Sequence, residues 1–208
     1  MARWMALCMM LLVAGPAAAD QKPTPESAAS MIKSTADQVM KAINADKARY
    51  RQHHDQLYQL VDDKVLPHVD AAYMTQLAVG RYWRRADHSQ KQQITDAFTR
   101  LLVRTYATSL LEYSGDNIHW LPVHARDRDQ DVTLRAQVHT SGGPPVPMIY
   151  RLHLQGGDWR VYDVVVDGVS LVTTYRSSFD DLISQKGMDG FIAALQKKAQ
   201  EAGPKAGS

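Results

Sequence analysis

Cysteine is almost absent from this chain of 208 residues, and the one present is Cys8, within the first apolar run. The chain therefore has no pair of thiols for a disulfide framework. If an amino-terminal leader that contains Cys8 is removed, cysteine-ligated metal sites and cysteine nucleophiles are excluded as well. Burial of apolar side chains must then hold the fold together.

Familiar catalytic signatures are missing too. The sequence contains no HExxH, no GxSxG and no glycine-rich phosphate loop, which argues modestly against a zinc protease, a serine hydrolase or a nucleotide-binding enzyme. Neither sign of charge is in excess, because 24 Lys and Arg residues stand against 22 Asp and Glu residues. That balance does not indicate a nucleic-acid-binding protein.

Long hydrophobic runs are also missing, apart from a short one at the amino terminus. The first residues, MARWMALCMMLLVAGPAAAD, combine basic Arg3, an apolar run and the small residues Ala17 and Ala19. This layout is typical of a cleaved secretory signal, and the run is too short to span a bilayer. A lipoprotein would carry its cysteine after the run, at the cleavage site, whereas Cys8 lies near its start.

We therefore predict a leader over residues 1–19, cleaved near Ala19, followed by one domain over residues 20–208 with a loose tail at 202–208. The mature chain is long enough to bury a sizeable core. No repeat and no low-complexity segment divides it.

Helical spacing of apolar residues dominates the first half of the mature chain. Thr24 and Pro25 are typical of a helix start, and Asp87 with Gln90 forms a variant of the capping box. The pattern predicts four helices here: one from Pro25, one around Leu57 that ends near Pro67, a short one from Tyr73 to Gly80, and the longest from about His88 to Tyr113.

Strand-like alternation follows. The segments DVTLRAQVHT and, after SGGPP, MIYRLHL each place apolar residues at every second position, which predicts an antiparallel hairpin with one apolar face. An earlier strand is expected from Asn117 to His124, and a last one in WRVYDVVV. Two further helices close the chain. This order predicts an α+β fold with helices packed on the apolar face of the sheet.

Clusters of ionisable residues have ordinary explanations. His53, His54 and Asp55 point in different directions on a helix, so we interpret them as a solvated face. The segment DRDQD, from Asp127 to Asp131, resembles the start of a calcium loop, but valine occupies the later glycine and glutamate positions, so we interpret it as a charged turn. No metal site is predicted.

The segment YDVVVDGVSLVTTYRSSFDDLISQKGMDGFIAAL resembles the carboxy-terminal signature of the MlaC family of periplasmic phospholipid-binding proteins, the toluene-tolerance auxiliary component of an ABC transporter. The family pattern is a strand ending in Tyr-Asp, then Gly-Val-Ser-Leu, Tyr-Arg-x-x-Phe and a glycine before the last helix. In this sequence the matching residues are Tyr162, Asp163, Gly168, Val169, Ser170, Leu171, Tyr175, Arg176, Phe179 and Gly187.

The resemblance extends upstream through VDDKVLPHVDAAYMTQLAVGRYWRRADHSQKQQITDAF and covers nearly the whole mature chain. Two departures are Asp87-His88, where the family commonly has Thr-Pro, and Lys91, where it commonly has arginine. The first keeps a helix cap and the second keeps the charge, so neither alters the expectation.

The resemblance implies a strongly twisted antiparallel sheet of four or five strands, packed with about seven or eight helices that enclose an apolar lipid pocket. It implies a monomeric periplasmic carrier of glycerophospholipid, with the lipid as cargo and no cofactor. The expected partners are an inner-membrane ABC transporter with an MCE-domain subunit and an outer-membrane lipoprotein with a porin. The expected role is maintenance of outer-membrane lipid asymmetry.

The lipid-binding residues are expected to be apolar and to come from both the helices and the sheet. They are Tyr73, Leu77, Phe98, Tyr106, Leu110, Val132, Leu134, Met148, Tyr150, Val164, Val166 and Val169.

Two other interpretations stay open at this point. Arg81, Arg84 and Arg85 form either a solvated rim or a docking surface. If they form a docking surface, the protein could be a docking module that binds no lipid. A small α+β enzyme would use Asp163 or a histidine, although a buried, hydrogen-bonded aspartate next to a tyrosine is the simpler explanation.

Overall fold

The computed structural model describes residues 23–112, 117–123, 130–139 and 143–203. The expected leader, most of the DRDQD segment and the last five residues of the expected tail lie outside them. Within the described residues, no helix is both long and apolar enough to cross a membrane.

The elements confirm an α+β architecture. The α-helices are α1 (Pro25–Ala45), α2 (Lys47–Gln52), α3 (His54–Lys64), α4 (Ala71–Val79), α5 (His88–Tyr106), α6 (Ser109–Glu112) and α7 (Leu171–Glu201). Two short 3-10 helices are η1 (Leu66–His68) and η2 (Gly80–Arg85). The strands are β1 (Asn117–Trp120), β2 (Asp131–His139), β3 (Val146–Gln155), β4 (Asp158–Val166) and β5 (Val169–Ser170).

The strands form one antiparallel sheet in the sequential order β1-β2-β3-β4-β5. The β3–β4 register shifts between Arg151 and Leu152, because Arg151 pairs with Asp163 and Leu152 pairs with Val161. Tyr162 is therefore the extra residue of a β-bulge, a feature that strengthens the local twist and re-aims side chains.

Both predicted helix caps are present. The Thr24 and Asp87 side chains each accept a hydrogen bond from the backbone N–H three residues later, and each forms a capping box. The predicted helix from His88 ends early, however, at Tyr106, and a turn separates it from α6. Leu110 and Leu111 keep helical spacing across that turn, so periodicity alone could not locate the break. The longest helix is α7, which contains a kink at Gly187.

The turn from sheet to α7 is a two-residue hairpin. Asp167 and Gly168 have φ angles of 50° and 80°, and Val166 pairs with Val169 on either side of them. Two successive positive φ angles fit the type I′ turn, for which Asp-Gly is a preferred sequence. This turn reverses the chain, so that β5 lies beside β4 and α7 begins next to the sheet.

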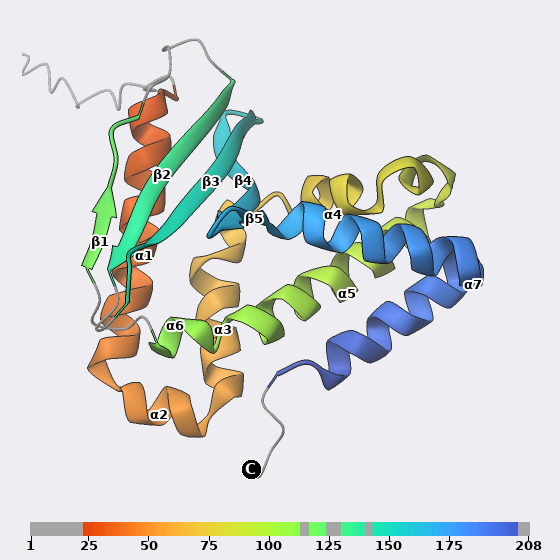
Figure 1. Ribbon diagram of the computed structural model, residues 1–208, viewed down its shortest axis with the longest axis horizontal. Helices are drawn as coiled ribbons and strands as arrows, with labels where there is room; N and C mark the ends of the chain where they lie inside the picture. The colour runs from red at the N-terminus through yellow and green to blue at the C-terminus, as the bar shows by residue number, and fades with distance from the viewer. Residues whose placement is uncertain (1–22, 113–116, 124–129, 140–142, 204–208) are drawn as a thin grey trace, which may run out of the picture.

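Three groups of buried apolar residues stabilise the fold. One joins α4, α5 and α7, a second joins the sheet to the first half of α1, and the third joins the second half of α1 to α3, α5 and α6. Figure 1 shows α1 behind the sheet and continuing past its lower end toward α2 and α3. One straight helix therefore belongs to two cores.

We predict that Gly187→Ala destabilises the protein. Gly187 has φ 69° and ψ −179°, a backbone conformation that is essentially restricted to glycine, whereas a Cβ would meet no atom within 4 Å. The cost therefore comes from backbone strain, on the order of 1–3 kcal/mol of unfolding free energy in a denaturant titration. Gln185→Ala, at an exposed position before the kink, is the control and should change stability little. Equal stabilities of the two variants would contradict this account.

Candidate functional site

The sheet has one apolar face and one polar face. The register aligns apolar side chains across β2, β3 and β4 in successive rows, such as Val132–Leu152–Val161 and Leu134–Tyr150–Val164. The next row, toward the β2–β3 hairpin, contains Trp120, Ala136, Met148 and Val166. The first half of α1 packs on this apolar face.

Burial decreases along these rows. Val132, Leu152 and Val161 are all buried under α1, whereas Tyr150 and Val164 in the next row keep accessible surface. We call the partly accessible part of this apolar face the open sheet face. Six of its residues are Trp120, Val138, Met148, Tyr150, Val164 and Val166.

The path of α1 explains why the face stays open. Ala28, Ala29 and Ile32 contact the sheet, but Val39 and Ile43, further along the helix, belong to the core formed with α3, α5 and α6. The helix therefore does not cover the hairpin end of the face. Residues of that core on and between the helices also keep accessible surface; they include Met40, Leu60, Val65, Leu66 and Leu110.

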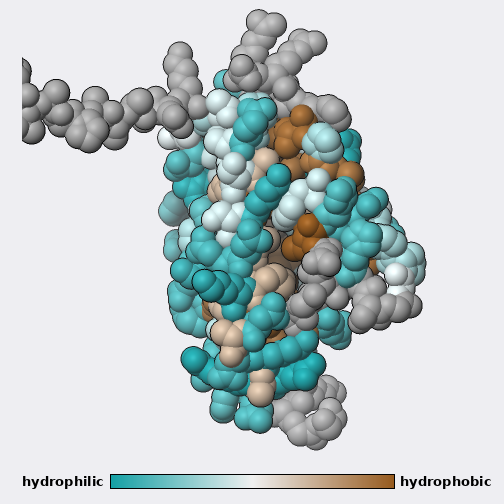
Figure 2. All heavy atoms as spheres, turned by 90° about the vertical axis from the view of Figure 1, so that its left-hand side faces the viewer, coloured by the Kyte–Doolittle hydropathy of each residue, from teal (hydrophilic) through white to brown (hydrophobic). Residues whose placement is uncertain are grey.

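Apolar side chains also reach the surface on this side of the molecule. Figure 2 views the side where β1 and α1 lie; it is mainly hydrophilic, with strongly apolar residues gathered in small patches toward the right of the view. Partly accessible apolar surface on both sheet and helices indicates a binding surface. It suits a flexible apolar ligand, because contact removes apolar surface of both partners from water.

Tyr150 is the polar side chain of the open sheet face. Burial raises the pKa of its hydroxyl to about 12, with no charged neighbour contributing. Its ring lies 6.0 Å from that of Trp120, centroid to centroid. The side chain is thus largely withdrawn from bulk water, although it keeps some accessible surface.

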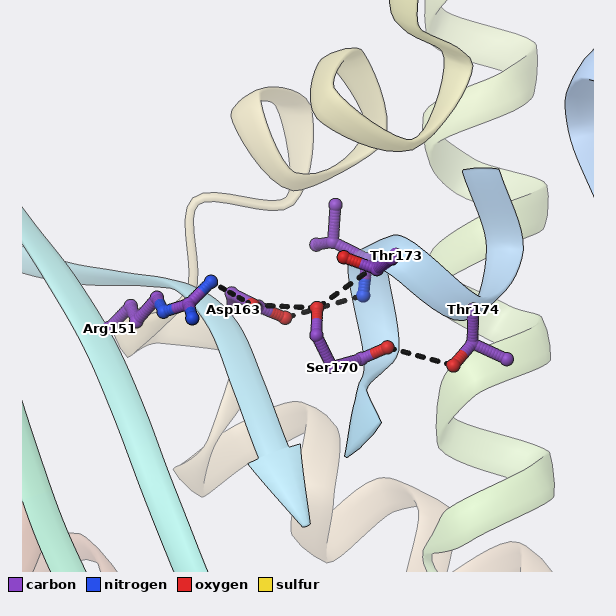
Figure 3. Close-up of polar contacts among 6 residues, drawn as sticks. Arg151, Asp163, Ser170, Thr173 and Thr174 are labelled. Atoms are coloured by element: carbon purple, nitrogen blue, oxygen red, sulfur yellow. Dashed lines mark hydrogen bonds and ion pairs between the residues drawn. The ribbon is translucent and has the colours of Figure 1, made fainter. Parts of the chain in front are cut away.

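On the polar face, Asp163 is the central group. Its carboxylate is only 2% exposed and accepts hydrogen bonds from Arg151 Nη1 at 3.0 Å and from the Ser170 hydroxyl at 2.8 Å. The Val172 backbone N–H donates to its other oxygen at 3.3 Å. Ser170 in turn accepts from the Thr173 N–H and so caps α7 (Figure 3). Asp163 therefore connects β3 and β4 to the start of α7, where the helix dipole stabilises a negatively charged carboxylate.

A second polar contact on this face joins the start of α4 to β3. Buried Asp70 accepts from the Tyr73 N–H and lies 2.9 Å from His153 Nε2, while the Tyr73 ring stacks on His153. Tyr162, at the bulge, packs edge-on against both rings. These contacts attach the start of α4 to β3 and β4.

The structure brings half of the expected lipid-binding residues together on one surface. Those on the apolar sheet face are Val132, Leu134, Met148, Tyr150, Val164 and Val166, of which Val132 and Leu134 are fully buried. Their role in binding lipid stays a prediction.

The other expected residues are dispersed. Leu77 and Phe98 contribute to the core of α4, α5 and α7, and Leu110 packs in the third core. Tyr73 lies on the opposite face of the sheet, against His153. Tyr106 and Val169 are 39% and 57% exposed. Sequence periodicity indicates burial but does not indicate which core a residue joins.

Trp120 and Val138 belong to the open sheet face but were missed as candidates. Alternation in DVTLRAQVHT does indicate that Val138 points toward the apolar face. Trp120 ends β1, a strand of four residues, which is a short segment in which to recognise alternation. Their accessibility depends on where α1 leaves the sheet, which no local pattern encodes.

Two surface pockets lie elsewhere. One of about 530 Å³ lies between α5 and the two ends of α7, and one of about 460 Å³ lies among α3, α4 and α5. Neither is lined by any of the expected lipid-binding residues. In the described part of the chain, no group of three or more His, Cys, Asp or Glu side chains is placed to hold a metal ion.

The arginines of η2 are partly engaged. Arg81 forms an ion pair with Asp180 at 2.9 Å and donates to the Tyr82 hydroxyl, and Arg85 lies over the Tyr82 ring. Arg84 is exposed. Their use as a docking surface stays a prediction.

Comparison with known proteins gives consistent matches. The family model described as MlaC protein matches residues 33–197. The toluene tolerance protein ttg2D of Pseudomonas putida is 26% identical, over 93% of this chain and 92% of that protein. The intermembrane phospholipid transport system binding protein MlaC of Haemophilus influenzae is 23% identical, over 82% of this chain and 81% of that protein.

A solved structure is similar as well. It is a phospholipid-binding protein from Ralstonia solanacearum in complex with a phospholipid, with a TM-score of 0.78 and 34% sequence identity. The match covers 84% of this chain and 97% of that one.

We predict that Asp163→Asn lowers stability markedly, since the asparagine side chain has only one acceptor oxygen. Its amide nitrogen must face either Arg151 and Ser170, which donate to one carboxylate oxygen, or the Val172 N–H, which donates to the other. The expected loss is about 1–3 kcal/mol of unfolding free energy. Asp158→Asn, whose side chain is 72% exposed beside Arg160, is the matched control and should cost less than about 1 kcal/mol. If thermal and denaturant unfolding showed similar losses for both variants, the structural role assigned to Asp163 would be wrong.

Proposed function

This chain belongs to the MlaC protein family, and we propose that it is a non-enzymatic carrier that binds the acyl chains of a glycerophospholipid at the open sheet face. The partly accessible apolar face carries this proposal. The related phospholipid-binding structure supports it, because that protein shares the fold over most of the chain.

The energetics suit a carrier. Each methylene removed from water contributes about 0.8 kcal/mol, so two acyl chains with roughly thirty methylenes would gain on the order of 25 kcal/mol. A bilayer gives nearly the same gain, so exchange between membrane and carrier is close to balanced. Escape into water is strongly unfavourable. Such a carrier therefore retains its lipid until it reaches an acceptor.

The route of transport is part of the proposal. After removal of the leader near Ala19, the chain works in the periplasm as a monomer. It moves lipid between an inner-membrane ABC transporter with an MCE-domain subunit and an outer-membrane lipoprotein with a porin, and so maintains outer-membrane asymmetry. The relatives named for phospholipid transport and toluene tolerance support this role. The lipid is cargo and not a cofactor.

The geometry does not favour the enzyme interpretation of Asp163. Its carboxylate accepts bonds from Arg151, Ser170 and the Val172 N–H. These contacts hold the start of α7 and orient the carboxylate toward protein donors. A hydrogen-bonded structural aspartate accounts for its burial.

We predict that Met148→Glu abolishes lipid retention. Native mass spectrometry of the mature protein, purified without detergent, should show a stoichiometric glycerophospholipid on the wild type. The variant should appear at its bare mass, because a carboxylate on the open sheet face is costly to desolvate against acyl chains. Circular dichroism would establish that the variant is folded.

Thr133→Glu is the matched control, since Thr133 is exposed on the polar face of the neighbouring strand. It should retain lipid as the wild type does. A folded wild type that carries no lipid and takes none from vesicles would refute the carrier function. Retention by folded Met148→Glu would refute the assignment of the open sheet face.

Removal of the lipid should lower thermal stability. A ligand that binds only the folded state stabilises it by mass action. An empty apolar cavity also costs about 24 cal/mol per Å³, which a domain held together by about 5–15 kcal/mol cannot sustain at large volumes. We therefore expect delipidated protein to melt at a lower temperature in calorimetry and to recover when vesicles of phosphatidylethanolamine and phosphatidylglycerol are added. An unchanged melting temperature would contradict this prediction.

A further inference from the structure

Tyr150 is surrounded by apolar side chains on the open sheet face. Leu134 and Val164 are its partners in the same row, on the strands to either side. Trp120 lies beside its ring, at 6.0 Å between centroids. The phenol therefore introduces one hydroxyl into a surface that is otherwise built from apolar side chains.

That hydroxyl has no hydrogen-bond partner among the described residues. The side-chain hydrogen bonds of the described chain include none to Tyr150, and its contact with Trp120 is between rings. The oxygen also keeps some solvent-accessible surface, since no fully buried side-chain oxygen in the described residues lacks a partner. The hydroxyl is therefore open to approach by a ligand atom.

Other buried polar groups of this fold are bonded. Trp159 Nε1 donates to the Thr24 carbonyl at 2.9 Å, and the Thr75 hydroxyl donates to the Ala71 carbonyl at 2.6 Å. Asp70 and Asp163 accept the bonds described above. A tyrosine hydroxyl that is withdrawn from water generally finds a partner. Tyr150 departs from this pattern at the proposed ligand site.

The hydroxyl is suited to donate a hydrogen bond to a neutral group. Its pKa of about 12 keeps it protonated at neutral pH, and its O–H is the only side-chain donor among the six residues named for the open sheet face apart from the Trp120 indole N–H. None of the six carries a charge. A phosphate or a free carboxylate would therefore be desolvated here without a counter-ion. A neutral carbonyl oxygen meets the requirement.

We propose that the Tyr150 hydroxyl donates a hydrogen bond to an acyl ester carbonyl of the bound glycerophospholipid, and so makes the site selective for ester-linked lipids. The proposal rests on the carrier function above. The ester lies where apolar chain meets polar glycerol, so it is the neutral acceptor that enters an apolar site together with the chains. An ether-linked lipid has the same shape but lacks the carbonyl.

Competition between two lipids tests the proposal. The mature wild-type protein is equilibrated with vesicles that contain equal amounts of diacyl and dialkyl phosphatidylethanolamine of the same chain length. Native mass spectrometry then gives the ratio of the two complexes. We expect the wild type to favour the diacyl lipid by about three- to tenfold, the range of one net hydrogen bond.

Tyr150→Phe removes only the hydroxyl. We expect it to load lipid, since the apolar surface is kept, but to bind the two lipids in nearly equal amounts. Tyr162→Phe, on the opposite face of the sheet, is the control and should keep the wild-type preference. A melting curve close to that of the wild type is expected for Tyr150→Phe, because no hydrogen bond to a described residue is lost.

Each other outcome overturns a defined statement. A wild type that loads both lipids equally, or a Tyr150→Phe variant that keeps the full preference, refutes the hydrogen bond but leaves the carrier function intact. A wild type that loads neither lipid refutes the carrier function, and the role of Tyr150 falls with it.

Discussion

The apolar face of the sheet extends further than the helix that covers it, and the rest of the structure follows from this mismatch. The first half of α1 buries the rows around Leu152, and its second half leaves the sheet to pack with α3, α5 and α6. A helix is too stiff to bend sharply without a proline, glycine or bulge, and the α1 sequence from Pro25 to Ala45 has no glycine and no internal proline. The hairpin end of the face therefore remains available to a ligand.

On the polar face of the same sheet, hydrogen bonds attach the starts of α7 and α4 to the strands. Asp163 couples β3, β4 and the start of α7, and Asp70 couples β3 to α4. These contacts give a physical reason for the Tyr-Asp and Gly-Val-Ser-Leu segments of the family signature. The aspartate is the acceptor, the serine is the cap, and Gly168, with φ 80°, completes the turn between them.

Local patterns predicted most of the elements. The caps at Thr24 and Asp87 and the hairpin of β2 and β3 were identifiable, because each depends on a few neighbouring residues. The break after Tyr106 was not identified, since apolar spacing continues across it. The short helix α2, KARYRQ, was not identified because it buries no residue and so has no apolar stripe. The site was predicted in part. Alternation indicates that Met148 and Tyr150 point inward, but Phe98 and Leu77 have the same apolar character and lie in a different core. Only the tertiary arrangement separates the two groups.

The sequential order of the strands also has a kinetic consequence. Each strand pairs with its neighbour in the chain, and β3, β4 and β5 are joined by turns of two residues. Sheets built from such local pairings have a low contact order and therefore tend to fold faster than sheets with distant partners. The edge strands, β1 and β5, comprise only four and two residues. Beyond β5, the chain at Val69 and Asp70 meets the outer edge of β4, where the Asp70 N–H donates to the Val161 carbonyl. Pairing between neighbouring strands therefore favours formation of the sheet before its contacts with distant helices.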